Sequence, residues 1–458
     1  MEVNASDASL AQSPAPDPPP IRVLVLYAIG QLGWSLASYS VANLLIYFYM
    51  PPETGQAVFP SFMHQGAVVG VFTLIGLLSA AGRFFDAVID PVVANWSDRS
   101  TAKQGKRRRF MLVGAVPFVL SSFLVFYPLS QAESAGNFMW LALCLGVYYF
   151  FFTVYVIPYT ALIAELGHRP KDRMLISTLL SVAWALGFVA GNGTYALQSY
   201  FEQQGKMPLQ AFQQALMLVN TFALVCLLLP ALFLNEKRYA RQAASEQGLR
   251  QSLLTVWANA NFRQFLLSDL LYWLALSFIQ LGIGFYTTLL LGLDKSYAFL
   301  FSLVSFAASF LFYVPVNFLA QKVGKKRLVL LAFLIFALVF AVVAGIGAIP
   351  LPKQVLLYGL GIAAAFPLAV FGILPNAIIA DVVEQEERSS GRQLAGMFFG
   401  VRTFVMKVGI SLANLIFPSL LLLGKSAQNP AGVQLTAGAA IIFCLAGWQA
   451  FRKFSEEF

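Results

Sequence analysis

The sequence contains few charged residues, few histidines and few cysteines for its length. Asp, Glu, Lys and Arg make up 11% of the 458 residues, whereas 59% are hydrophobic, and there are only 2 histidines and 3 cysteines. This composition excludes a disordered chain and an ordinary water-soluble enzyme. Cys144, Cys226 and Cys444 all fall within apolar runs, so we expect buried thiols and no disulfide framework.

Motifs that carry enzyme chemistry are also missing from the sequence. There is no HExxH metal motif, no nucleophile elbow and no phosphate-binding loop, and His64 and His168 both stand at loop positions. We therefore expect no enzyme and no cofactor.

What the sequence has in abundance is long apolar runs. A helix that spans a membrane needs about 20 mostly apolar residues. Twelve such runs occur, at 23–50, 66–96, 110–130, 138–165, 174–201, 212–234, 264–291, 296–321, 328–349, 354–380, 393–423 and 434–454. The sequence therefore predicts an all-α polytopic membrane protein with twelve transmembrane helices.

The positive charges are distributed unevenly along this pattern. The net charge is +9, and most of the 30 Lys and Arg lie in the tails and in the loops after even-numbered runs. Lys206, Lys295, Lys353 and Lys425 are the exceptions, in loops after odd-numbered runs. This bias is the positive-inside pattern, so we expect a plasma or inner membrane protein with both termini in the cytoplasm. The distribution of positive charge thus indicates how the chain is oriented in the membrane, and it does not indicate a nucleic-acid partner.

Composition along the chain predicts four regions. Residues 1–21 are polar and Pro-rich and predict a disordered cytoplasmic tail, and 235–262, the longest polar connection, predicts a cytoplasmic linker. The linker separates two six-helix bundles, 22–234 and 263–458. Two segments of the first bundle recur in the second. In "DPVVANWSDRSTAKQGKRRRF" and "VPVNFLAQKVGKKRLV" a Pro-Val precedes a Gly and several basic residues. In "IPYTALIAELGHRPKDR" and "LPNAIIADVVEQEERSSGR" a Pro stands six or seven residues before an acid. Such internal repeats are typical of transporters.

One helix of the first bundle carries charges where lipid would exclude them. Arg83, Asp86 and Asp90 stand at i, i+3 and i+7 and so share one helix face. Each charge near mid-membrane costs about 2.5–3.5 kcal/mol, so this face must turn toward the protein interior or a watery cavity. Two carboxylates one turn apart can bind a small cation or share a proton. The alternative is that they only hold helices together, and for Arg83 that alternative is as strong.

Two further intramembrane cations lie in the eleventh run, "VRTFVMKVGISLANLIF". Lys407 lies about four turns inside its helix, so we expect it to pair with Asp86 or Asp90 across the protein, and not to reach the membrane surface. Arg402 either stabilises an anionic substrate or pairs with an acid near a helix end. Asp269 is expected to be such a helix-end or gate charge.

Charged residues after the even-numbered runs form a candidate cytoplasmic gate. We expect Glu165 to pair with Arg169 and Arg173, and Asp381 with Arg388 and Arg392. The full set of gate candidates is Asp98, Arg99, Glu165, Arg173, Asp381 and Arg392. Ordinary solvated turns are the alternative.

With these residues in hand, the chain resembles the glycoside–pentoside–hexuronide:cation symporters (melibiose permease-like) of the major facilitator superfamily. The resemblance rests on R-x-x-D-x-x-x-D-P at Arg83–Pro91, on "SDR" with "GKRRRF", and on "IPY", "ADVVE" and "FGVRTFVMKVG". It implies the major facilitator fold, a cation site made by Asp86, Asp90 and Thr153, and a helix 11 lysine at Lys407.

Departures from that family leave the ion and the solute open. Ile89 stands where the family has an asparagine, so one oxygen that could bind Na+ is missing. Both Na+ and H+ therefore remain candidates for the coupling ion. Ser35, Val156, Thr160 and Ser181 replace its sugar-binding side chains. The substrate-site candidates that remain are aromatic or polar, namely Gln31, Trp34, Ser35, Ser38, Tyr39, Asn43, Tyr155, Tyr159, Trp184 and Arg402. They suit a neutral sugar or an amphiphile.

The sequence therefore predicts a monomeric secondary active transporter in the lipid bilayer. It would couple a monovalent cation to symport of a small organic solute, with a sugar or glycoside as the main hypothesis. A lysolipid or other amphiphile is the alternative, and a passive channel or membrane enzyme is the third reading.

Overall fold

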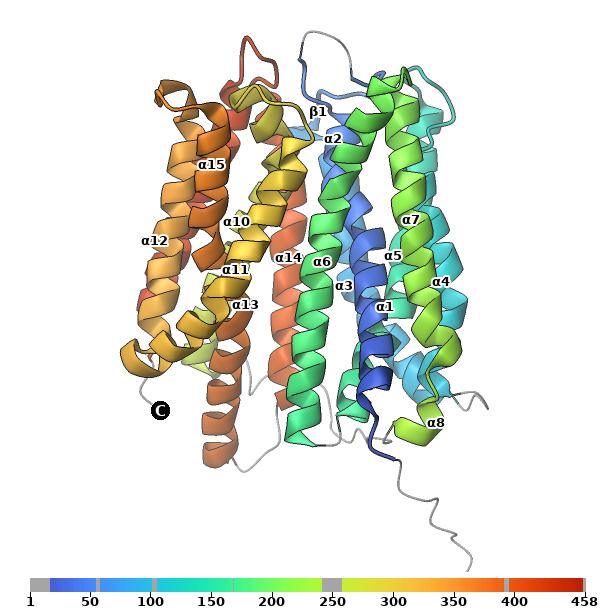
Figure 1. Ribbon diagram of the computed structural model, residues 1–458, viewed down its shortest axis with the longest axis vertical. Helices are drawn as coiled ribbons and strands as arrows, with labels where there is room; N and C mark the ends of the chain where they lie inside the picture. The colour runs from blue at the N-terminus through green and yellow to red at the C-terminus, as the bar shows by residue number, and fades with distance from the viewer. Residues whose placement is uncertain are drawn as a thin grey trace, which may run out of the picture.

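The computed structural model describes residues 17–54, 58–100, 105–167, 169–240, 258–390 and 395–455, and most of these residues are helical. The long helices stand side by side, and both ends of the described chain lie at the lower end in Figure 1. We call this the terminus end, where Ile21 begins α1 and Arg452 ends α15, and the opposite one the far end. Most of the predicted tail (1–21) and of the linker (235–262) lies outside the described residues.

The first half of the chain forms six long helical segments. They are α1 (Ile21–Tyr39), continued by the π-helical turn η1 (Ser40–Leu44) and α2 (Leu45–Tyr49), then α3 (Leu74–Arg99), α4 (Lys106–Leu124), α5 (Ala135–Leu166), α6 (Pro170–Gln203) and α7 (Pro208–Phe233). Thr73 and Ser134 begin α3 and α5 by accepting the backbone N–H groups of Gly76 and Asn137. Proline at the first position begins α6 and α7.

The second half repeats this arrangement. A short helix, α8 (Glu236–Tyr239), follows α7, and the six long segments are α10 (Ala260–Phe285) with the π-helical turn η2 (Tyr286–Leu290), α11 (Tyr297–Val323), α12 (Lys325–Ala344), α13 (Lys353–Ser390), α14 (Ala395–Leu421) and α15 (Ala431–Arg452). A single 3-10 turn, η3 (Ile346–Ala348), links α12 to α13. Within the described residues the prediction of twelve helical spans in an all-α membrane protein is therefore confirmed.

Hydropathy separates two of the twelve spans from the rest. Ten described helices are long and apolar enough to cross a membrane, and α3 and α4 are not among them. Helix α3 carries Arg83, Asp86 and Asp90 in its middle, and α4 begins with four basic residues, Lys106–Arg109. Both helices nevertheless run along the same direction as the other long helices (Figure 1).

The start of the second span differs from the prediction. Residues 66–73 were expected to be helical, but Ala67–Val69 (β1) pairs antiparallel with Phe72–Thr73 (β2). Gly70, with φ +59°, makes the turn between them, a conformation that residues with a Cβ adopt rarely. The β-branched residues Val68, Val69 and Val71 favour this hairpin over a helix.

Two groups of helices meet along one interface. In the first group α1 packs on α6 and α7, α4 packs on α5 and α7, and α3 packs on α5. In the second group α10 packs on α14 and α15, α12 on α13 and α15, and α11 on α13. The groups are joined mainly by α3 against α14 and by α6 against α11, and α14 and α6 stand at the centre of Figure 1. Functional residues on α3, α6, α11 and α14 therefore lie at the boundary between the halves.

Candidate functional site

The charged face of α3 turns into the protein. Asp86 is fully buried and Arg83 is 8% exposed. The residue before Arg83 is Gly82, where an added Cβ would lie 2.3 Å from the ring of Tyr149 on α5. Glycine therefore allows α5 to approach closely, and the Arg83 guanidinium lies 5.4 Å from the centre of the Tyr149 ring. This contact holds the arginine against α5.

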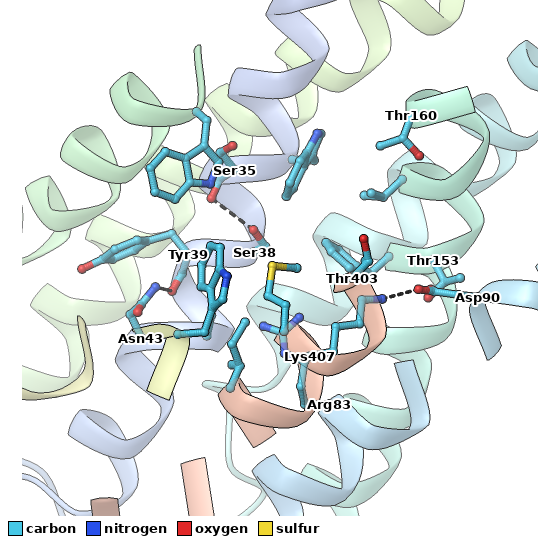
Figure 2. A pocket seen from close by; sticks show the side chains of 18 of the residues that line it. Ser35, Ser38, Tyr39, Asn43, Arg83, Asp90, Thr153, Thr160, Thr403 and Lys407 are labelled. Carbon is cyan, nitrogen blue, oxygen red and sulfur yellow. Dashed lines mark hydrogen bonds and ion pairs between the residues drawn. The ribbon is translucent and has the colours of Figure 1, made fainter. Parts of the chain in front are cut away.

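Lys407 of α14 bridges the two aspartates of α3. Its Nζ lies 2.6 Å from Asp90 Oδ2 and 2.9 Å from Asp86 Oδ2, and a dashed line in Figure 2 marks the contact with Asp90. Arg83 Nη1 lies 3.4 Å from the same Asp86 oxygen. The structure thus brings together the residues that the sequence predicted to pair, and the pair crosses the boundary between the halves.

Thr153 of α5 completes this cluster. Its hydroxyl donates a hydrogen bond of 2.8 Å to Asp86 Oδ1. Oδ1 of Asp90 is buried and has no hydrogen-bond partner among the described residues. Carboxylate and hydroxyl oxygens are the ligands that hard cations prefer. We name Arg83, Asp86, Asp90, Thr153 and Lys407 the α3 cluster.

A second charge cluster lies about one turn and a half earlier on α14. Arg402 binds Asp269 of α10 through two contacts, Nε to Oδ2 at 3.0 Å and Nη2 to Oδ1 at 3.1 Å. Its Nη1 also donates to Asn376 Oδ1 of α13 at 2.7 Å. Of the two roles predicted for Arg402, the structure has the pairing with an acid, and all three residues belong to the second half. We name them the Arg402 cluster.

Two cavities lie between the halves beside these clusters. The first, about 390 Å³, is lined by Trp34, Ser35, Tyr39 and Trp184 among the predicted substrate residues, together with Asp90 and Lys407 of the α3 cluster. Figure 2 shows Ser35, Ser38, Tyr39 and Asn43 facing the charged side chains across this space. The second, about 320 Å³, is lined by Gln31, Trp34, Trp184 and Arg402. Cavities of this size suit small organic molecules.

Two predicted substrate residues line neither of these cavities. Tyr155 donates to the carbonyl of Leu227 on α7 at 2.9 Å, and Tyr159 donates to the carbonyl of Tyr27 on α1 at 2.7 Å. Both side chains are fully buried inside the first half. Their aromatic rings hold α1, α5 and α7 together, whereas the sequence analysis had placed them among the substrate residues.

Beyond Arg402 and Lys407, the sequence interpretation missed residues that the second half contributes to the first cavity. Trp273 and Gln280 of α10 and Thr403 of α14 line the first cavity. Trp273 and Gln280 stand seven residues apart and so share a helix face. A single glutamine within the run "LALSFIQLGIGF" is the signal that would have identified this face.

The predicted gate pairs have other partners. Glu165 binds Arg107 of α4, with Nη2 to Oε1 at 2.8 Å, and Arg107 also binds Asp98 at 2.5 Å. The Arg173 side chain donates to the carbonyl of Gly167, so it is not the partner that was expected for Glu165. Arg99 is exposed.

The same correction applies to the second half. Asp381 binds Lys325 at the start of α12, and Arg388 binds Glu384 on its own helix. Arg392 lies outside the described residues. The pairs at Glu165 and at Asp381 each join helices within one half, so they do not connect the two halves as a gate would.

The far end holds polar contacts between the halves. Lys425 Nζ, after α14, lies 3.0 Å from Glu53 Oε1 and donates to Gln65 Oε1 at 2.9 Å. Lys295 and Glu202 form a second ion pair of 2.5 Å, and Ser199 donates to Asp294 Oδ1 at 2.9 Å. These contacts join the loop after α2 and the last turns of α6 to the loops after α14 and η2. We call them the far-end clasp.

Asp294 of this clasp stays charged over a wide pH range. Burial by itself would raise the pKa of its carboxyl, but hydrogen bonds from Ser296 and Ser199 and the charge of Lys295 outweigh burial and lower the pKa. Because the folded pKa is lowered, the stabilisation is present above the unfolded value and is lost as pH falls through the folded value, below about 4. The contact between Ser199 and Asp294 is therefore insensitive to pH near neutrality.

The fold matches known transporters. A D-xylose-proton symporter superposes with a TM-score of 0.69 at 15% identity and covers 95% of this chain and 97% of its own. At this identity the match establishes the fold alone, which is that of the major facilitator superfamily.

Sequence comparison identifies the family. Residues 26–446 match the family described as "MFS/sugar transport protein". The "Inner membrane symporter YicJ" of Escherichia coli (strain K12) is 23% identical over 404 residues, which are 83% of each chain. The "Isoprimeverose transporter" of Lactiplantibacillus pentosus is 22% identical over 442 residues, 94% of this chain and 87% of that one. The chain is therefore an integral, multi-pass membrane transporter, not an enzyme, and it belongs to the glycoside–pentoside–hexuronide family of the major facilitator superfamily.

Proposed function

We propose that this protein is a cation-coupled symporter that moves an organic solute, a sugar or glycoside, by alternating access. The observation that carries the proposal is the position of Lys407, whose ammonium lies 2.6 and 2.9 Å from two carboxylates of the opposite half. The names of similar proteins, a symporter and a sugar transporter among them, agree with it.

The α3 cluster balances its charge without any bound ion. Arg83 and Lys407 offset Asp86 and Asp90, so a coupling ion adds a positive charge unless one of the built-in cations withdraws. Na+ would compete with Lys407 for oxygens of Asp86, Asp90 and Thr153, whereas a proton on Asp90 would remove one of the two charges that attract Lys407. Either ion weakens the contact between α3 and α14 and so links ion binding to movement of the halves.

The described conformation fits one stage of this cycle. The far-end clasp joins the halves, and the second cavity lies on the terminus side of the first. We infer this order because Gln31 precedes Ser35 in α1 and Arg402 precedes Lys407 in α14, and both helices begin at the terminus end. The basic residues of the loops at the terminus end support a cytoplasmic position for that end and for both termini. The conformation is then inward-facing.

Uptake by reconstituted protein tests the proposal. Proteoliposomes carrying the full chain are given labelled sugars, labelled lysolipid or organic acids under an imposed Na+ gradient, a pH gradient or neither. We expect concentrative uptake of a sugar or glycoside with one of the two gradients. Accumulation of lysolipid alone would favour the amphiphile alternative, and transport down the solute gradient only would exclude coupling.

The variant Asp90→Asn connects this assay to the α3 cluster. It removes one of the two charges that hold Lys407 and should abolish concentrative uptake while solute exchange across the membrane persists. Asp98→Asn, which alters a carboxylate at the terminus end, is the control and should still accumulate solute. Accumulation by Asp90→Asn at the wild-type level would exclude Asp90 from the coupling site.

A further inference from the structure

Three tryptophans form a neck between the two cavities. Trp34 of α1, Trp184 of α6 and Trp273 of α10 line both the cavity of about 390 Å³ and that of about 320 Å³. Trp34 and Trp184 belong to the first half and Trp273 to the second. A solute that passes from the α3 cluster to the terminus end must therefore pass this tryptophan neck, which both halves build.

The charged side chains that line these cavities are all paired. In the first cavity they are Arg83, Asp90 and Lys407, which bind one another or Asp86. In the second the charged lining residue is Arg402, which binds Asp269 through two contacts. Across the described lining, each charged side chain therefore has an oppositely charged partner, although Arg83 Nε and Asp90 Oδ1 make no hydrogen bond. A charged solute would either bury its own charge unpaired or break one of these pairs, and both are unfavourable.

The neck also offers a hydrogen-bond donor. Nε1 of Trp34 is buried and has no acceptor among the described residues. Around it, the neutral polar side chains of Ser38, Gln280 and Thr403 line one cavity, and those of Gln31 and Ser181 line the other. Indole faces with neutral donors and acceptors at their edges match the apolar faces and equatorial hydroxyls of a pyranose ring.

We propose that the tryptophan neck holds an uncharged glycosyl ring, with a hydroxyl or ring oxygen accepting the Trp34 N–H. The rest of the glycoside extends into the second cavity. This inference rests on the proposed function, because it takes the two cavities as the route of the transported solute. It adds that the solute is neutral and names the residues that hold it.

Binding to purified full-length protein without any ion gradient tests the inference. The probes are 4-nitrophenyl glycosides of glucose, galactose and xylose in both anomers, the uronide counterparts of the glucose and galactose glycosides, and lysophosphatidylcholine. Each uronide differs from its neutral counterpart only by a carboxylate at C6. We expect at least one neutral hexoside to bind about tenfold or more tightly than its uronide, since the site has no spare cation for the carboxylate.

Two variants locate the binding site. Trp34→Phe keeps an aromatic ring but removes the N–H, so the neutral glycoside should bind about fivefold more weakly. Trp140→Phe is the matched control, because Trp140 Nε1 is also buried without a partner but Trp140 lines neither cavity. This control should bind as the wild type does.

Several results would overturn the inference. They are a uronide that binds as tightly as its neutral counterpart, unchanged binding by Trp34→Phe, binding of lysophosphatidylcholine alone, or binding of none of the probes. The comparison of neutral and acidic probes uses the unaltered protein, so it stands even where a variant fails to fold. If the reconstituted protein accumulates an acidic solute with a cation gradient, the proposed symport function is supported but the inference of a neutral solute is wrong.

Discussion

Helix α14 contributes to two buried charge clusters that differ in what they connect. Lys407 reaches across the boundary between the halves to Asp86 and Asp90 of α3. Arg402, five residues earlier, binds Asp269 and Asn376 within its own half. The two clusters thus share helix α14, but one binds residues of the first half and the other binds residues of the second half.

Movement of the halves must break the contact of Lys407 with α3, whereas it leaves the contacts of Arg402 intact. When the halves rock as rigid bodies, distances across the boundary change and those inside each half do not. The α3 cluster is therefore placed to sense the conformation, whereas the Arg402 cluster holds α10, α13 and α14 together. Four predictions test this contrast, from the largest expected effect to the smallest.

The Arg402 cluster should contribute most to stability. Arg402→Met leaves Asp269 buried without its cation, which should lower the free energy of unfolding by about 3–5 kcal/mol. Adding Asp269→Asn should recover part of that loss, because no buried charge then remains unpaired. Thermal or denaturant unfolding of the purified protein measures both variants. Arg388→Ala, at an exposed pair on α13, is the control, and an equal loss there would contradict the assignment.

The α3 cluster should be less important for stability but sensitive to ions. Lys407→Met removes one of two cations near the aspartates, so we expect a loss of about 2 kcal/mol. With its competitor gone, the coupling ion should bind more tightly, so Na+ or acidification should raise the melting temperature of the variant more than that of the wild type. Choline chloride at equal ionic strength is the control. A variant no more responsive to either ion than the wild type would argue against competition between Lys407 and the ion.

Thr153 should affect the ion more than the solute. Thr153→Val removes the hydroxyl that contacts Asp86, and we expect the apparent affinity for the coupling ion to fall about fivefold. The solute affinity should fall less. Thr160→Val is the control for the ion affinity alone, because Thr160 lines the first cavity but its hydroxyl bonds to the carbonyl of Ile157 and not to an aspartate. The reverse order of effects would remove Thr153 from the ion site.

The far-end clasp should have the smallest effect. Lys425→Ala removes a partly exposed ion pair, worth about 0.5 kcal/mol, and should shift the population of far-end-open molecules roughly twofold. Labelling of a Ser38→Cys reporter by a membrane-impermeant reagent from the far side measures that shift, since the three native cysteines are buried. Lys322→Ala, at the terminus end of α11, should leave the labelling unchanged. Slower labelling in Lys425→Ala would mean that the clasp does not hold the far end closed.

The charged residues inside the membrane were predictable because they have few acceptable arrangements. Arg83, Asp86 and Asp90 share a helix face, and Lys407 needs a carboxylate, so spacing and charge were enough to predict their pairing. The internal repeat was informative as well. Gly105 and Gly324 both have positive φ, and each precedes a helix whose early basic residue, Arg107 or Lys325, binds the acid of the matching repeat segment.

Other parts could not be predicted because several residues compete for one role. Near the terminus end many Arg and Lys lie within reach of each acid, and the sequence alone does not choose Arg107 for Glu165 over Arg169 or Arg173. Aromatic residues pose the same difficulty. Tyr155 packs inside a half while Trp273 lines a cavity, and both occur in similar apolar runs.

The ion pairs at the terminus end have a consequence for the speed of the cycle. Arg107 with Glu165, and Lys325 with Asp381, tie helices together within each half, so these pairs persist when the halves separate or approach. The activation barrier of the conformational step then depends on the contacts that cross the boundary between the halves, those of the clasp and of the α3 cluster. Pairs within a half set how stiff that half is, and pairs across the boundary set how many times per second the protein turns over.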